Sequence, residues 1–229
     1  MQNNKRYERK FVVDSIPKET IELIIKQHRA CFSQIYQERS INNIYLDTHN
    51  FMFYLDNNFG KGQRKKVRIR WYGDMLGKIA KPVLEFKIKL GAVGDKLSFR
   101  LKPFDVNRNF TKEHLRKVFL ESDLPAWVIE DVLPLEPKLL NKYSRKYFLS
   151  ADKNFRTTID FNLQYFQIGK YNNCFIKGAT DEKGTIVELK YKYDKDNLAE
   201  LISNGFPFRL TKSSKYVNGI EKFYYNIPV

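Results

Sequence analysis

The sequence predicts an α+β fold that is mainly antiparallel β. Apolar and polar residues alternate with period two over seven segments, whereas helical periodicity is confined to four others, and the two kinds do not alternate as in a parallel sheet. The chain has 229 residues, of which 42% are hydrophobic, so it can bury a core and is no disordered polycation. Because no linker-like stretch or repeat interrupts it, we expect a single domain over residues 1–229.

The predicted strands share a pattern in which every second residue is apolar. Val67, Ile69 and Trp71, for example, alternate with basic residues. Such alternation is typical of antiparallel strands that have one face on the core and one polar face. The segments that follow the rule are residues 7–12, 42–47, 66–71, 84–89, 97–102, 155–161 and 186–191.

The predicted helices carry recognisable start or stop residues. Pro17 stands near the start of the first, and Thr111 is a favourable N-cap for the second. The third is followed by Pro134 and the fourth by Gly205, two residue types that end helices. The four segments are residues 16–31, 111–120, 127–133 and 196–204.

The chain is strongly basic. It has 41 Lys and Arg against 26 Asp and Glu, a formal net charge of +15. In a folded protein such a surplus indicates a polyanionic partner, which leaves nucleic acid, anionic lipid and phosphate-rich small molecules open. No apolar run approaches the ~20 residues of a membrane span, and the N-terminus has no apolar signal segment. We therefore expect a cytoplasmic protein.

The cysteines and histidines suggest no site. Cys31 and Cys174 have neither metal nor disulfide spacing, so we expect buried or half-buried reduced thiols. His28, His49 and His114 show no triad or ligand spacing, and we assign them no role.

The charged residues of the predicted strands fall on one face, in rows. Directly opposed like charges destabilise a sheet, so rows of cations on neighbouring strands imply an anion that offsets them. If these faces point inward, the fold is an eight-stranded closed barrel with flanking helices, whose interior holds one small ligand. A concave cationic interior suits a triphosphate or a longer phosphate chain. The rows include Lys10, Arg68, Arg70, Lys87, Lys89, Arg100, Lys102 and Arg156.

A few glutamates lie among these cations. A hard divalent cation bound with phosphate takes one or two carboxylates. Glu188, with Glu8 or Glu85, is the candidate ligand set. The alternative for Glu8 and Glu85 is a simple ion pair with a neighbouring lysine.

Eight short strings occur in order over nearly the whole chain: residues 6–11 (RYERKF), 43–48 (NIYLDT), 67–73 (VRIRWYG), 84–87 (LEFK), 143–145 (YSR), 156–160 (RTTID), 187–190 (VELK) and 212–216 (KSSKY). Together they resemble the VTC domain, the catalytic module of the vacuolar transporter chaperone polyphosphate polymerase. That family belongs to the triphosphate tunnel metalloenzymes, which are related to the CYTH group of adenylate cyclases and triphosphatases.

The resemblance implies a tunnel of antiparallel strands in which the γ-phosphate of ATP is transferred to a growing polyphosphate chain with Mn²⁺ or Mg²⁺. It implies that Glu188 binds the metal ion, and we add Glu8 as a second candidate metal ligand. It also implies that Tyr143 lies near the base or ribose of the nucleotide. Lys212 and Ser214, with Lys215, match a segment that holds the triphosphate. Lys89, Arg100 and Lys102 are added as substrate-binding residues from the alternation alone. The residues implied to grip the phosphates are Lys10, Arg68, Arg70, Lys87, Arg145, Arg156 and Lys215.

The sequence departs from its relatives in two ways. The CYTH group begins with the pattern E-x-E-x-K, but Arg6 replaces the first glutamate here and leaves Glu8 and Lys10. This argues against the two-metal hydrolytic arrangement of that group. The chain also has neither the phosphate-sensing domain nor the membrane helices of the eukaryotic complex, so we do not expect coupling to membrane translocation.

Polyphosphate synthesis from ATP is the predicted function, with ATP and polyphosphate as partners. The nearest alternative is a triphosphatase, because one tunnel can serve water or phosphate as acceptor. The other is a non-catalytic binder of polyphosphate or nucleic acid, for which the basic and aromatic segments 61–72 and 143–148 are suited. Since no nucleic-acid-binding module signature occurs, no specific nucleic acid is expected. Residues 61–66 are expected to be an exposed basic loop.

Overall fold

The structure is a computed structural model that describes residues 6–91, 93–173, 175, 178–181 and 184–224. It confirms an α+β fold that is mainly antiparallel β. Within the described ranges, no helix is long and apolar enough to cross a membrane. The strands are β1 (Arg6–Val13), β2 (Ser33–Asp47), β3 (Gln63–Tyr72), β4 (Gly77–Ile79), β5 (Val83–Leu90), β6 (Val93–Arg100), β7 (Phe104–Val106), β8 (Glu136–Leu149), β9 (Arg156–Gln167), β10 (Gly178–Asp181) and β11 (Thr185–Lys192). The helices are α1 (Lys18–Gln27), α2 (Met52–Asn58), α3 (Lys112–Glu121), α4 (Ala126–Val132), α5 (Asp196–Asn204) and α6 (Lys215–Glu221), with a 3₁₀ turn at Tyr193–Lys195.

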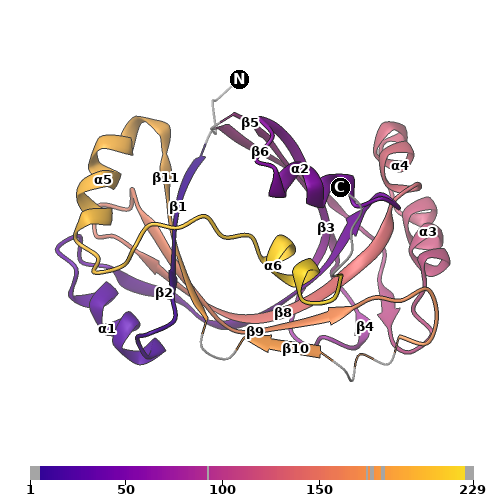
Figure 1. Ribbon diagram of the computed structural model, residues 1–229, viewed down its shortest axis with the longest axis horizontal. Helices are drawn as coiled ribbons and strands as arrows, with labels where there is room; N and C mark the ends of the chain where they lie inside the picture. The colour runs from indigo at the N-terminus through magenta and orange to yellow at the C-terminus, as the bar shows by residue number, and fades with distance from the viewer. Residues whose placement is uncertain (1–5, 92, 174, 176–177, 182–183, 225–229) are drawn as a thin grey trace.

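The main sheet curves round a central space (Figure 1). Its strand order is β10-β9-β11-β1-β6-β5-β3-β2-β8, and β8 pairs in addition with β9. The eight strands from β9 to β8 therefore follow one another round that space, while β10 extends the edge of β9 and β4 pairs with β7 separately. Every pairing is antiparallel.

The prediction of a closed barrel is wrong, because the main sheet does not close. Among the described residues, β1 pairs with β11 along its whole length but meets β6 at one position, Arg6 opposite Gly94. Figure 1 shows β1 standing apart from β5 and β6. Since adjacent strands twist relative to one another, two edges that touch at one end separate beyond it. The sheet is thus strongly curved, with a gap between β1 and β6 beyond their point of contact.

The apolar residues of the alternating strands face outward, onto helices. Ile21 of α1 and Ile202 of α5 belong to one buried cluster with Phe11 of β1 and Val187 of β11. On the other side, helices α3 and α4 pack on β3 and β5, where the buried residues include Ile69, Trp71, Leu84, Phe86, Leu115 and Val128. The charged faces therefore point into the curve of the sheet, as the sequence predicted.

Helix α6 lies inside that curve (Figure 1). Tyr216 and Ile220 pack with Leu139 of β8 in a third buried cluster. The Tyr216 hydroxyl donates to the buried Asp47, whose carboxylate also accepts the backbone N–H groups of α2 at Phe53 and Tyr54. One carboxylate thus anchors both helices at the end of β2.

The four predicted helices are all present, three of them with shifted ends. Helix α1 begins after Pro17 and is shorter than expected, and α5 has the predicted bounds. In α3, Thr111 is the N-cap and its Oγ1 accepts the backbone N–H of His114. Helix α2, helix α6 and the long strand β8 were not predicted as elements.

Three local expectations were wrong. Residues 61–66 are not wholly a loop, since β3 begins at Gln63 and takes Lys66 into the sheet. Strand β6 ends at Arg100, so Lys102 lies beyond it. Cys31 is an exposed free thiol, and Cys174 lies outside the described residues.

Candidate functional site

A small cavity opens inside the curve of the sheet. Its volume is about 80 Å³, enough for a few water molecules. The cavity is small because the side chains around it reach across it and pair with one another. A larger hollow of about 470 Å³ lies between α1 and α5, but among the described residues that line it Arg29 is the one Lys, Arg, Asp or Glu. The described residues that line the small cavity come from β1, β2, β3, β5, β8, β11 and α6: Glu8, Lys10, Tyr45, Lys66, Arg68, Arg70, Lys87, Tyr143, Arg145, Glu188, Lys190, Ser214 and Lys215.

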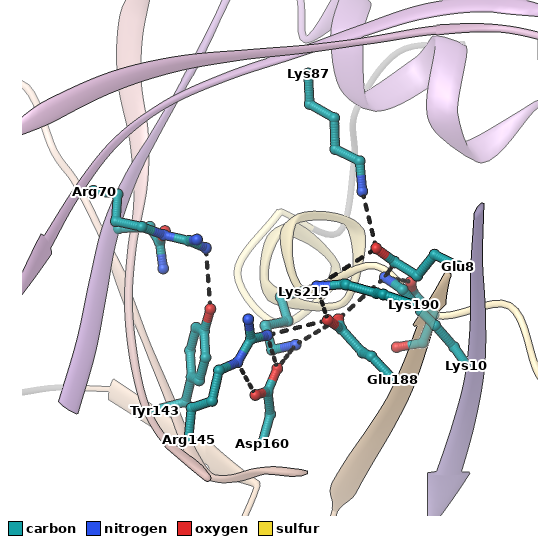
Figure 2. Close-up of polar contacts among 12 residues, drawn as sticks. Glu8, Lys10, Arg70, Lys87, Tyr143, Arg145, Asp160, Glu188, Lys190 and Lys215 are labelled. Carbon is teal, nitrogen blue, oxygen red and sulfur yellow. Dashed lines mark hydrogen bonds and ion pairs between the residues drawn. The ribbon is translucent and has the colours of Figure 1, made fainter. Parts of the chain in front are cut away.

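Glu8 and Glu188 stand side by side on one wall of the cavity, bridged by two lysines (Figure 2). Strand register places Glu8 opposite Lys190, and Lys10 opposite Glu188. The Lys10 Nζ lies 2.9 Å from Glu8 Oε1 and 3.5 Å from Glu188 Oε1. The Lys190 Nζ lies 2.8 Å from Glu188 Oε2 and 3.7 Å from Glu8 Oε2.

These cations decide the charge of both carboxylates. Burial alone raises the pKa of Glu188, but the four cations around it, led by Lys190 and Lys215, hold the pKa well below its usual value. Burial and the Glu188 charge likewise raise the pKa of Glu8, and its lysine neighbours reverse the shift. Both groups are therefore carboxylates at neutral pH.

A second cluster joins β8, β9 and α6. The Arg145 guanidinium donates to both oxygens of Asp160, with Nη2 to Oδ2 at 2.5 Å, and its Nη2 also donates to Glu188 Oε2 at 3.2 Å. Lys215, at the start of α6, places its Nζ 2.5 Å from Asp160 Oδ2 and 3.5 Å from Glu188 Oε1. Because Asp160 is fully buried, both of these cations are held in fixed positions.

A third cluster orients Arg68 on β3. Its Nε and Nη2 donate to Glu85 Oε2 at 2.8 and 2.7 Å, and Lys96 donates to Glu85 Oε1 at 2.7 Å. Burial raises the pKa of Glu85, but Arg68, Arg70 and Lys96 hold it below the usual value. In this structure the Glu85 carboxylate pairs with Arg68 and Lys96 and is not among the described residues that line the cavity.

Arg70 and Tyr143 meet across the cavity from the acidic wall (Figure 2). The Arg70 Nη2 donates to the Tyr143 hydroxyl at 3.1 Å, and its Nε donates to Asn43 Oδ1 at 2.9 Å. The Lys215 Nζ stands 4.8 Å from the centre of the Tyr143 ring. Tyr143 is thus buried among three cations, one of which is Arg145.

Lys66 differs from the other cations of the cavity. Its Nζ donates to Ser214 Oγ at 2.7 Å, but no carboxylate in the described part of the chain forms an ion pair with it. Burial lowers the pKa of Lys66 well below the usual value, and the charges of Lys10 and Lys87 lower it further. For Lys87, Glu8 raises the pKa, but burial and neighbouring lysines lower it to about 8 overall. The cavity therefore holds more positive charge than its carboxylates offset.

Ten of the fifteen site residues predicted from the sequence line this cavity. Lys89 is half-buried beyond Lys87, where burial and the charge of Arg64 lower its pKa. The other four are exposed and outside the lining, on or beside β6 and β9 and before α6: Arg100, Lys102, Arg156 and Lys212.

The sequence prediction missed four residues that belong to the site. Lys66 and Lys190 continue the alternation of Arg68 and Glu188, and that pattern could have identified them. Asp160 lies in the quoted string 156–160, but its pairing with Arg145 depends on β8 lying beside β9. Tyr45, whose hydroxyl accepts from Arg68 Nη1 at 3.5 Å, has no such signal.

The carboxylates of the site do not form a protein-only metal centre. Among the residues that the structure describes, no group of three or more His, Cys, Asp or Glu side chains converges to hold a metal ion. Glu8 and Glu188 are the two carboxylates exposed to the cavity. A metal ion held here would need further oxygen ligands from a bound molecule.

Three solved structures are similar over nearly the whole chain. HpAC1 from Hippeastrum, a putative adenylyl cyclase described as having dominant triphosphatase activity, superposes with a TM-score of 0.55 at 14% identity and covers 95% of this chain and 96% of its own. PH1819 from Pyrococcus horikoshii gives 0.52 at 11% identity, with coverages of 94% and 99%. A putative adenylate cyclase from Vibrio parahaemolyticus gives 0.52 at 12% identity, with coverages of 93% and 97%. At sequence identities this low, the structural similarity establishes the fold of the chain alone.

No curated protein sequence matches the chain significantly. The model of the VTC domain matches residues 5–224. That range includes all of the cavity residues and all eight of the short strings found in the sequence. The chain therefore belongs to the VTC domain family.

Proposed function

We propose that this chain binds the phosphates of a nucleoside triphosphate in the cavity and transfers the terminal phosphoryl group, most simply to a polyphosphate chain. The observation that carries the proposal is the lining of the cavity. Eight of its thirteen described residues are Lys or Arg and two are Glu, so bound phosphates would offset the remaining positive charge. Membership of the VTC domain family supports the same reaction class.

Phosphoryl transfer depends on position and charge neutralisation more than on covalent chemistry. Arg68, Arg70 and Arg145 offer planar guanidinium groups that can bind phosphate oxygens in pairs. Each is already oriented by a fixed acceptor, namely Glu85, Asn43 or Asp160. Bound phosphates would share these donors, so the groups need little reorganisation during the reaction.

The acidic wall suits a divalent cation bound together with phosphate. Mg²⁺ and Mn²⁺ favour oxygen ligands, and Mg²⁺ commonly takes one or two carboxylates with substrate phosphates. Glu8 and Glu188 supply such a pair once Lys10 and Lys190 turn toward the phosphates. The metal would neutralise charge on the transferred group.

The proposed reaction moves one phosphoryl group. An oxygen of the acceptor phosphate forms a bond to the γ-phosphorus of ATP, and the bond from that phosphorus to the bridging oxygen breaks. ADP leaves, and the polyphosphate chain is one unit longer. Lys87, Lys190 and Lys215 border the cavity and would hold the negative charge of donor and acceptor together. The exposed Arg156 and Lys212, with Lys89, would draw phosphate chains toward the cavity.

A triphosphatase is the second candidate, supported by the described activity of the Hippeastrum protein that shares the fold. In that case water replaces the acceptor phosphate and inorganic phosphate is released. The arrangement of cations is compatible with both acceptors.

The test is incubation of the purified chain with ATP and MnCl₂, followed by electrophoretic separation of the phosphate products. Chains longer than three phosphates, formed only with metal, are the expected result. Release of free phosphate without longer chains would replace the polymerase by the triphosphatase. No metal-dependent consumption of ATP or tripolyphosphate would refute both.

A further inference from the structure

The two ends of the tunnel-like interior differ in chemistry. On the inward face of β3, the residues run from Arg64 through Lys66, Arg68 and Arg70 to Tyr72, a distance of eight residue steps or ~26 Å at ~3.3 Å per step. At the Arg64 end, strand register places Lys89 opposite Arg64. Burial lowers the pKa of Lys89, and the charges of Arg64, Lys10 and Lys212 lower it further although Glu8 raises it. At the Tyr72 end the side chains are mainly aromatic.

The aromatic end, which we call the aromatic mouth, consists of Tyr36, Arg39, Tyr72 and Tyr147. The Arg39 guanidinium carbon lies 4.4 Å from the centre of the Tyr36 ring, 5.7 Å from that of Tyr72 and 5.5 Å from that of Tyr147. Irregularities in the pairing of β2 with β8 on both sides of Tyr36 allow Tyr36 and Arg39 to reach the same group of rings.

The aromatic mouth is open to solvent. Tyr36 is 45% exposed and Tyr72 is 54% exposed, whereas Tyr147 is 9% exposed and forms the floor. Arg39 is exposed too, and no carboxylate in the described ranges forms an ion pair with it. Large aromatic rings and an unpaired guanidinium are thus presented together at one place.

The aromatic mouth is continuous with the phosphate-binding cavity. Strand register places Arg39 opposite Arg145, whose guanidinium carbon is 5.8 Å from the centre of the Tyr147 ring and 5.4 Å from that of Tyr143. Figure 2 shows Arg145 and Tyr143 turned into the cavity. A ligand whose phosphates lie at Arg70 and Arg145 would reach this mouth if its remainder extended past Tyr143.

We propose that the aromatic mouth is a nucleobase subsite, at which Tyr36, Arg39 and Tyr72 stack on the base of the nucleoside triphosphate. Aromatic rings and guanidinium planes are the side chains on which proteins stack bases, and such stacking tolerates different bases. The flat ring faces favour a base over a phosphate chain, for which the opposite, basic end is better suited. The inference rests on the proposed function only because it takes a nucleoside triphosphate as the ligand. It adds an orientation, with the base at the aromatic mouth and the phosphates in the cavity.

The test compares a ligand that has a base with one that lacks it. Calorimetric titrations measure the affinity of ATP and of inorganic tripolyphosphate for the wild-type chain and for the double variant Tyr36→Ala, Tyr72→Ala. Because each stacked ring contributes about fivefold or more, the ATP affinity is expected to fall at least about tenfold while the tripolyphosphate affinity stays unchanged. Two matched controls are Tyr36→Phe with Tyr72→Phe, which keeps the rings, and Tyr171→Ala, which removes another exposed tyrosine.

The two ligands make the outcomes distinct. Equal losses for ATP and tripolyphosphate would show that the mouth serves phosphate binding and would overturn the subsite, as would unchanged affinities for both. The Phe variant should bind ATP like the wild type, and circular dichroism with thermal melting confirms that every variant is folded. If the wild type binds ATP with a base-dependent preference but turns over no substrate, the proposed function fails and the subsite stands.

Discussion

Lys66 is a cation of the site that a bound anion could pair with. It is half-buried, donates to Ser214, and has no carboxylate partner in the described residues, whereas Arg68 and Arg145 each have one. A buried cation without a counter-ion destabilises the folded chain. We infer that the cost is offset when phosphate binds.

Lys66→Met keeps the length of the side chain and removes its charge, so it should stabilise the ligand-free protein. The expected gain is about 1 kcal/mol, or a melting temperature ~2–4 °C higher for a chain of this size. Thermal unfolding at neutral pH and low phosphate measures it. A melting temperature lower than that of the wild type would contradict the description of Lys66 as an unpaired cation.

The same residue predicts a pH dependence of binding. The pKa of Lys66 is low in the empty cavity because of burial and neighbouring cations, and a bound polyanion raises it. Between these two pKa values binding therefore takes up a proton, and tripolyphosphate affinity falls as pH rises. Calorimetry in buffers of different ionisation enthalpy counts the protons. Equal proton uptake by the wild type and Lys66→Met would assign the effect to other groups.

Glu188→Gln separates binding from turnover. Glu188 lies among Lys10, Arg145, Lys190 and Lys215, so removing its charge leaves more positive charge for an anion. Tripolyphosphate affinity should be kept or raised. Metal-dependent turnover should fall at least about a hundredfold, because a carboxylate of the proposed metal site is lost. A variant that turns over ATP normally would exclude Glu188 from that role.

At the scale of the elements, α6 carries part of the site into the interior. Ser214 is its N-cap and Lys215 its first residue, while Tyr216 is tied to Asp47. Gly219 sits where an added Cβ would lie 2.7 Å from Cδ1 of the Tyr165 ring. The added Cβ would also meet Leu139 of β8, so the position of Lys215 depends on close packing of this helix against both β8 and β9.

Gly219→Ala should shift α6 and displace Lys215 from Asp160. Overpacking of this kind costs about 1–3 kcal/mol, and turnover should fall by more than the loss of folded protein explains. Urea unfolding and a turnover assay on the folded fraction measure the two effects. Gly62→Ala is the matched control, because a Cβ there meets nothing within 4 Å. Equal effects of both substitutions would contradict the packing argument.

Strand β8 shows why part of the fold could not be predicted from period-two alternation. Its residues Leu139, Leu140 and Asn141 are consecutive and all buried, since α6 covers one face of the strand and the core covers the other. Helix α6 was missed because it is seven residues long and contains Gly219, which is a poor helix former. Arg68 and Arg70 follow the alternation of β3, whose inward face is basic from Arg64 to Arg70, and both line the cavity.

The extent of the site was harder to predict than its centre. Alternation shows which face a residue is on, but not how far along the strand the cavity reaches. Arg156 lies at the first position of β9 and Arg100 at the last of β6, and both are exposed. The ion pairs of Asp160 and Glu85 depend on strand register, which the sequence does not reveal.

At the scale of the whole molecule, the structure divides the net charge of +15 between an interior and a surface. The cavity lining concentrates Lys and Arg inside the curved sheet, whereas residues such as Lys117 on α3 are exposed on the outside. Surface cations favour polyanions in general and are screened by salt. We infer that a phosphate chain binds inside the curved sheet and not on this outer surface.

Titration of inorganic tripolyphosphate into the wild type, Lys66→Met and Lys117→Met at physiological salt distinguishes binding inside the sheet from binding on the surface. Both substitutions remove one lysine charge, but only the first removes it from the cavity. One chain should bind per protein, with an affinity at least about tenfold lower for Lys66→Met and unchanged for Lys117→Met. Equal affinities for the two variants, or several weak sites that disappear with salt, would place binding on the outer surface and not inside the curved sheet.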